Sequence, residues 1–365
     1  MYNILDYLKW RCDLTFEAAP FNEVDNYIIS KIGFLDFEDI VPEDSREVSL
    51  KDAIELYKEK AVDPNHKSVY LASPHIVPVT LSLPQYRRYA DIRLSGFRSV
   101  INDRLTEQFS ALTVRLPNGY NYVSFRGTDD TLIGWRENCN MAFTYPVQAQ
   151  KDALAYLNWA ASAYAGPIVV GGHSKGGNLA VFAASVAPQN VQNRIVKVYS
   201  NDGPGFKFNF FDMLGYQGIK DRVETIIPNY SLVGVLLKQP DNTVIVNTEH
   251  MGAASHDGYL WEVDCDHFVR ADGLSKSSIA VKEAIDYMVT QMTPEEIEEF
   301  TNDVFGSLEF FGDENITELS EHKLRSYLKM VGSLGKDREM RRFLIKVFEQ
   351  MILEYQAQNQ AENNA

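Results

Sequence analysis

The segment IVVGGHSKGGN, residues 168–178, decides the fold of this chain. It begins with an apolar, β-branched run that is typical of a short buried strand, and the residues after it favour a helix. Between the two lies Gly172-His173-Ser174-Lys175-Gly176, a G-x-S-x-G pattern. Side chains at positions 172 and 176 would collide with the strand and the helix, which explains both glycines. We therefore expect Ser174 to stand at a sharp turn as a nucleophile; a structural glycine-rich turn is the alternative.

Short β-branched runs alternate with amphipathic segments on both sides of this turn. Helices are predicted at residues 151–164 and 176–187, and strands at residues 111–116, 121–125, 168–171, 194–200, 223–227 and 244–247. The turn sequence Pro117-Asn118-Gly119 joins the first two strands as a hairpin. This alternation predicts an α/β fold with a mostly parallel central sheet flanked by helices.

The flanking regions differ in pattern from this core. Residues 1–105 are predicted to form a mainly helical region that packs on or caps the core, with helices at 50–60 and along the basic, aromatic run 86–104. The core is assigned to residues 106–292. A helical extension is expected at residues 293–355, followed by a polar, disordered tail at 356–365.

Composition excludes several classes of protein. The chain has 365 residues, 45% of them hydrophobic, so it can bury a sizeable core. Its net charge of −15 argues against nucleic acid as a partner, because phosphate binding needs clustered cations. Three widely spaced cysteines form neither a disulfide framework nor a zinc motif. We expect a cytoplasmic protein with no signal peptide, transmembrane segment, metal or cofactor.

A serine nucleophile needs a base, and four histidines follow Ser174 in the chain. His256 is favoured because it follows a loop of small residues just after a predicted strand. His250, at the end of that strand, and His267 remain alternatives. His322 lies in a charged helical stretch and is expected to face solvent.

The base in turn needs an acid, and the intermediate needs two donors. Asp202 closes the strand that follows the nucleophile segment, which places its carboxylate at the carboxyl edge of the sheet; a turn-forming aspartate is the alternative. The backbone N–H groups of Lys175 and Thr128 are predicted to form the oxyanion hole. We expect the Lys175 side chain to project into solvent and His173 to pack beneath the turn.

These motifs resemble a known family. Phe125-Arg-Gly-Thr128, the segment 171–178 and the turn Ser200-Asn-Asp-Gly-Pro-Gly-Phe206 resemble the class 3 lipase group of α/β-hydrolases. With Pro20-Phe-Asn-Glu-Val-Asp-Asn26 and the segment 227–234, they are more similar to a bacterial branch, the Mbeg-like family. The resemblance spans roughly residues 1–270.

The resemblance implies an α/β-hydrolase fold, a nucleophile at Ser174, an oxyanion donor at Thr128 and a histidine at His256. Class 3 lipases usually carry their aspartate near the position of Ser231 in this chain. Either Asp202 has taken over that role, or Ser231 orients His256 in a degenerate triad.

We therefore expect a serine hydrolase that cleaves a carboxylic ester, a small acyl ester or a lipid, through an acyl-enzyme on Ser174. A thioester or an amide is also compatible with this machinery. The alternative is a catalytically degenerate protein of hydrolase shape that serves as a binding or scaffold protein through its helical C-terminal segment.

Overall fold

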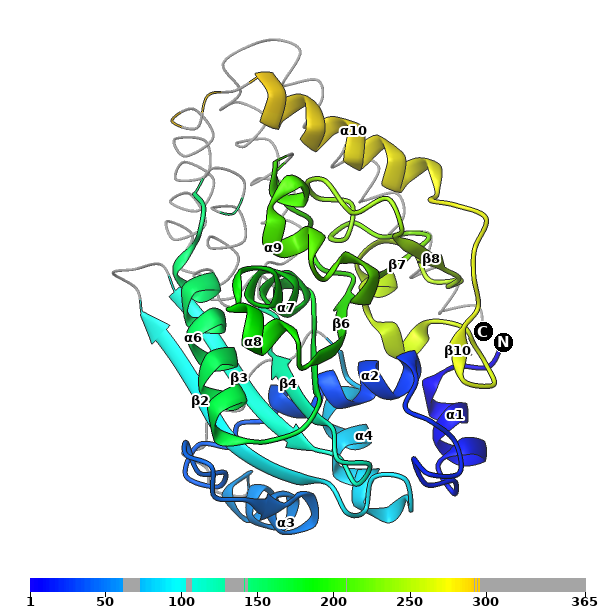
Figure 1. The fold of residues 1–365 in the computed structure, drawn as a ribbon. Coiled ribbons are helices and arrows are strands. Elements are labelled where there is room, and N and C mark those ends of the chain that lie inside the picture. Colours follow the sequence, from blue (N-terminus) through cyan, green and yellow to red (C-terminus); the bar gives the residue numbers. More distant parts are fainter. Residues whose placement is uncertain are drawn as a thin grey trace.

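An eight-stranded sheet forms the centre of the molecule in the computed structural model (Figure 1). The structure describes residues 1–61, 73–102, 107–128, 141, 144–207, 209–291, 293 and 295. The strands lie in sequence order: β1 (Val48–Ser49), β2 (Arg93–Asn102), β3 (Glu107–Arg115), β4 (Asn121–Phe125), β5 (Ile168–His173), β6 (Ile195–Asn201), β7 (Val223–Pro228) and β8 (Val244–Val246). The pairs from β1 to β4 are antiparallel and those from β4 to β8 are parallel. The expected mostly parallel α/β-hydrolase sheet is thus confirmed.

Two apolar cores cover the opposite faces of this sheet. Successive residues of a strand point to opposite faces, and in β5 Val169 belongs to one core while Ile168 and Val170 belong to the other. The first core holds side chains of α1 (Ile4–Arg11), α2 (Glu23–Ser30), α3 (Leu50–Ala61) and α4 (Ile76–Ser82). The second holds those of α6 (Gln148–Ala163), α7 (Lys175–Val186) and the short α8 (Gln189–Gln192) and α9 (Leu214–Gln217).

The chain beyond β8 adds a small ribbon and one long helix. The ribbon pairs β9 (Val263–Asp264) with β10 (His267–Phe268), and α10 (Lys276–Gln291) follows it. Among the helices that the structure describes, none has the length and hydropathy that crossing a membrane requires. The predicted extension at residues 293–355 and the tail at 356–365 lie outside the described part of the chain, apart from residues 293 and 295.

The helix predicted over residues 86–104 is wrong, because most of this run is strand β2. β2 pairs with β3 on both sides of a bulge between Ser95 and Arg98, and at the bulge the N–H of Gly96 donates to the carbonyl of Pro42, so its backbone groups are satisfied without a helix. One of its basic residues covers aromatic surface: the Arg98 guanidinium lies 4.8 Å from the Trp159 ring centroid and 5.2 Å from that of Tyr156. The N-terminal region therefore adds two strands, β1 and β2, to the sheet of the core.

A buried ion pair holds the N-terminal helices to this sheet. Asp25 of α2 and Arg88, which precedes β2, are both fully buried and pair at 2.5 Å. The carboxylate also accepts hydrogen bonds from the hydroxyls of Tyr7 and Tyr89. The guanidinium donates to backbone carbonyls of the loop after α1, including that of Ala19 at 3.0 Å. Each charge is therefore satisfied, as a buried pair requires.

We predict that Arg88→Met lowers the free energy of unfolding by about 3–5 kcal/mol, because it leaves the Asp25 carboxylate buried without its partner. Urea unfolding of the purified variant measures this loss. Arg46→Met is the matched control: Arg46 pairs with Asp44 at the exposed surface, so its loss is expected to cost nothing measurable. Equal losses in the two variants would contradict a supporting role for the buried pair.

Candidate active site

Ser174 stands on a sharp bend between β5 and α7. Its backbone has φ 58° and ψ −132°, a conformation that residues other than glycine rarely adopt. Neighbouring backbone leaves no room for side chains on either side of it. A Cβ atom on Gly172 would lie 2.3 Å from the carbonyl carbon of Gly176, and one on Gly176 would lie 2.1 Å from the carbonyl oxygen of Phe125. This is the geometry expected of a nucleophile elbow.

Hydrogen bonds from β6 and α2 hold the elbow from below. The Ser174 N–H donates to the carbonyl of Asn201 at 2.9 Å. The Asn201 side-chain amide donates to the carbonyl of Gly172 at 3.0 Å, and its oxygen accepts from the Asn26 amide at 2.9 Å. Asn26 and Asn201 each lie in a segment quoted for the family resemblance, but their pairing was not predicted, because they are 175 residues apart and no local motif connects them.

A short hydrogen bond joins Asp202 and His256. His256 Nδ1 lies 2.5 Å from Asp202 Oδ2. The carboxylate is fully buried at the end of β6, whereas the imidazole side chain is 19% exposed. Because a carboxylate only accepts, Nδ1 carries the proton and donates, which leaves Nε2 facing away from the aspartate.

Ser231 contacts the aspartate and makes no hydrogen bond to the histidine. Its hydroxyl donates to Asp202 Oδ1 at 2.5 Å, and the Gly234 N–H donates to the same oxygen at 3.0 Å. The other carboxylate oxygen, Oδ2, is the one that faces His256. Of the two arrangements that the sequence left open, the structure has the one in which Asp202 meets the imidazole. Ser231 lies behind it and fixes the carboxylate.

The loop that carries His256 is anchored on both sides of the imidazole. Ser255 donates to the carbonyl of Tyr230 at 2.8 Å, and its own carbonyl accepts from the Trp261 indole at 2.7 Å. Gly258 N–H donates to the hydroxyl of Tyr27 in α2 at 2.7 Å. Helix α2 therefore supports this loop through Tyr27, as it supports the elbow through Asn26.

His173 joins this loop to the elbow. Its ring lies 4.2 Å from that of His256, centroid to centroid, and its Nε2 donates to the His256 carbonyl at 2.8 Å. Burial depresses the pKa of His173 well below its usual value, and the nearby Lys31 lowers it further. His173 thus packs beneath the elbow as expected. Within the described residues no hydrogen bond joins the Ser174 hydroxyl to His256; such contacts often tighten only when substrate binds.

Gly127 lies beside the nucleophile, while the Lys175 side chain points elsewhere. A Cβ atom on Gly127 would lie 2.5 Å from the carbonyl oxygen of His173 and 3.1 Å from Ser174 Cβ, so the end of β4 approaches the elbow closely. The expectation that Lys175 projects into solvent is wrong. The side chain is fully buried and its ammonium donates to Gln108 Oε1 at 2.7 Å. Of Lys175, only the backbone N–H therefore remains as a candidate donor to an oxyanion.

Neither His250 nor His267 makes a hydrogen bond to Asp202 in the described part of the chain. His267 is in the exposed ribbon and contacts Asp266 at 3.3 Å. The backbone N–H of His250 donates to the Thr248 hydroxyl, and no hydrogen bond between its ring and a carboxylate occurs within the described chain. His322 lies outside the described residues.

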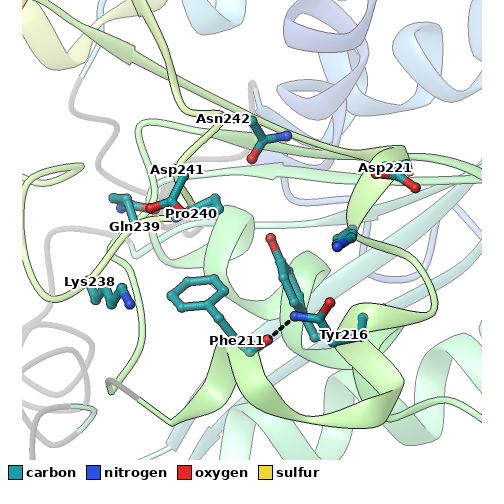
Figure 2. A pocket seen from close by; sticks show the side chains of 10 residues that line it. Phe211, Tyr216, Asp221, Lys238, Gln239, Pro240, Asp241 and Asn242 are labelled. Atoms are coloured by element: carbon teal, nitrogen blue, oxygen red, sulfur yellow. Dashed lines mark hydrogen bonds between the residues drawn. The ribbon is translucent and has the colours of Figure 1, made fainter.

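A hollow opens near α9. It has a volume of about 290 Å³, and its lining includes Phe211, Tyr216, Lys220 and Asp241 (Figure 2). None of the residues predicted from the sequence to form the site lines it.

Solved structures give partial similarities to lipases. The crystal structure of M37 lipase is 14% identical over 57% of this chain and 68% of that protein, with a TM-score of 0.38. A propeptide complex of Rhizomucor miehei lipase is 14% identical over 43% of this chain and 57% of that one, with a TM-score of 0.31. Comparison with curated protein sequences gives no match.

The family comparison covers more of the chain. Residues 83–306, more than half of the sequence, match the model of the Mbeg1-like family. This stretch contains the elbow, the buried aspartate and the histidine loop described above. The chain belongs to the Mbeg1-like family.

Proposed function

We propose that this protein is a serine hydrolase that cleaves a carboxylic ester through an acyl-enzyme on Ser174. The observation that carries the proposal is the 2.5 Å contact between Asp202 and His256 beside an elbow that presents Ser174 at φ 58°. A nucleophile on a strained turn, an imidazole near it and a buried carboxylate on that imidazole are the three groups that acyl transfer requires.

The first half of the reaction forms the acyl-enzyme. His256 Nε2 takes the proton of the Ser174 hydroxyl as the oxygen attacks the ester carbonyl. Asp202 stabilises the resulting imidazolium through Nδ1. The backbone N–H groups of Lys175 and Thr128 receive the oxyanion of the tetrahedral intermediate. When this intermediate collapses, the bond to the alcohol breaks and His256 gives its proton to the departing oxygen.

The second half consumes water. His256 takes a proton from a water molecule, whose oxygen attacks the acyl carbon and forms a second tetrahedral intermediate. Collapse of this intermediate breaks the bond to Ser174, the proton returns to the serine oxygen, and the carboxylic acid leaves. The first turn of α7 adds the positive end of a helix dipole beside both oxyanions.

We predict that Ser174→Ala abolishes labelling by a fluorophosphonate probe and lowers the turnover of p-nitrophenyl butyrate at least about 1,000-fold, because no other hydroxyl is presented at the elbow. Gel fluorescence and absorbance at saturating ester measure the two effects. Ser185→Ala is the matched control, since the Ser185 hydroxyl only donates to a carbonyl of its own helix. Undiminished labelling of Ser174→Ala would remove Ser174 from the mechanism. Absence of wild-type turnover above the Ser174→Ala rate would favour the binding or scaffold alternative.

We predict that Asp202→Asn and Ser231→Ala lower kcat unequally. The asparagine variant loses the charge that stabilises the imidazolium and should lose about 1,000- to 10,000-fold. Ser231→Ala removes one of the hydrogen bonds to a carboxylate that keeps the Gly234 N–H, so it should lose less than about tenfold. Steady-state kinetics of both variants, with circular dichroism as the folding control, decide the point. Equal losses would make Ser231 as important as the aspartate.

A further inference from the structure

Lys31, the residue after the last turn of α2, is a buried cation beside the proposed site. Its side chain is 2% exposed. The ammonium lies over two aromatic rings, 4.9 Å from the centroid of Tyr27 and 4.7 Å from that of Phe34. Ring faces attract a cation, but they replace only part of its lost hydration.

No anion in the described chain pairs with this ammonium. Asp257 and Asp202 are the nearby carboxylates, and each is held by other groups. Asp257 accepts hydrogen bonds from the Ser73 hydroxyl at 2.6 Å and from His75 Nδ1 at 3.0 Å. Asp202 faces His256 and Ser231. Within the described residues the Lys31 ammonium has no hydrogen bond and no ion pair, although the backbone N–H of Lys31 donates to the carbonyl of Ile28; an unpaired ammonium is unusual for a buried lysine.

The two rings around Lys31 also contact the elbow. Phe34 comes within 3.4 Å of the position that a Cβ atom would take on Gly127, and Ser174 Cβ lies 3.1 Å from the same point. Tyr27 packs edge-on against His173, with 5.6 Å between ring centroids. The same two rings that lie under the ammonium therefore also pack against the elbow and against Gly127 beside it.

We propose that the Lys31 ammonium binds an anionic group, a carboxylate or a phosphate, of the ester that Ser174 attacks. This inference rests on the proposed function and assigns its substrate class. An anionic group of the substrate would pair with the Lys31 ammonium, which has no ion-pair partner among the described residues.

The charge of Lys31 depends on pH in the physiological range. Burial lowers the pKa of this amine to about 7, although Asp257 and Asp202 act in the opposite direction. His173 faces it from the elbow and, with its depressed pKa, stays neutral. His75 faces Asp257, which raises the pKa of His75. Lys31 is therefore cationic below about pH 7 and loses its charge above it, so a preference for anionic esters should fade as pH rises through this value.

The test compares paired esters that differ in one anionic group. One pair is mono-p-nitrophenyl glutarate and p-nitrophenyl pentanoate, which place a carboxylate or a methyl group on the acyl side. The other is lysophosphatidic acid and the monoacylglycerol of the same acyl chain, which place the phosphate on the alcohol side. For each pair the ratio of kcat/KM, anionic over neutral, is measured at pH 6 and pH 8.5 after subtraction of the Ser174→Ala rate.

Lys31→Met should lower this ratio at least tenfold in one pair at pH 6, and the wild-type ratio should fall toward that of the variant at pH 8.5. A change in the first pair assigns an acidic acyl group, and a change in the second assigns a phosphate headgroup. Lys220→Met is the control, because Lys220 is exposed in the hollow of Figure 2 and should leave both ratios unchanged. Lys31→Gln, which keeps a polar group without the charge, replaces the methionine variant if that variant does not fold.

Unchanged ratios in both pairs would overturn the inference while Ser174-dependent turnover continued. Proportional loss on anionic and neutral esters would also overturn it, because it would give Lys31 a structural role. Absence of Ser174-dependent turnover of all four esters would instead refute the proposed function itself. The two failures are thus distinguishable.

Discussion

The backbone of Ser174 occupies a region that L-amino acids avoid, and the surrounding structure has to keep it there. Such a conformation costs on the order of 1–3 kcal/mol. It is held by the carbonyl of Asn201 below and by tight backbone contacts at Gly172 and Gly176 on either side. The proposed reaction depends on this constraint, because a relaxed turn would move the Ser174 hydroxyl away from the loop that carries His256.

Support for that turn comes from sequence-distant parts of the chain. Asn26 reaches it through Asn201, and Tyr27 fixes the loop that carries His256. Both residues lie on α2, which the buried pair of Asp25 and Arg88 ties to the segment before β2. The N-terminal helices therefore belong to the same structural body as the proposed reacting groups, although they supply no reacting group themselves.

The sequence predicts this protein well where signals are local. The elbow, the hairpin before it and the parallel strands all follow from short motifs and alternating patterns. Prediction is wrong for β2, because the run 86–104 was assigned to a helix; within it Arg98 lies on a strand and stacks over aromatic rings of α6. The prediction that the Lys175 side chain reaches solvent is also wrong. Its hydrogen-bond partner, Gln108, lies 67 positions earlier, and no residue near Lys175 in the sequence indicates this contact.

From the sequence, the residue that orients His256 could only be narrowed to Asp202 or Ser231. Asp202 and Ser231 are 29 residues apart, and local pattern does not reveal that the serine points at the aspartate and not at the imidazole. Lys31 gives no sequence signal either, since a lysine at the end of a helix normally reaches water. Through-space contacts of this kind depend on the packing of several elements and are absent from any single motif.

The stretch that matches the family begins at residue 83, after α2 has ended. A module excised at that boundary would retain the serine, the aspartate and the imidazole but not the asparagine and tyrosine of α2 that set their spacing. The segment that is needed to hold these residues in place is consequently longer than the segment that matches the family model. A shortened version of this protein therefore has to keep the first helices, because their side chains hydrogen-bond to the residues that support the elbow and the histidine loop.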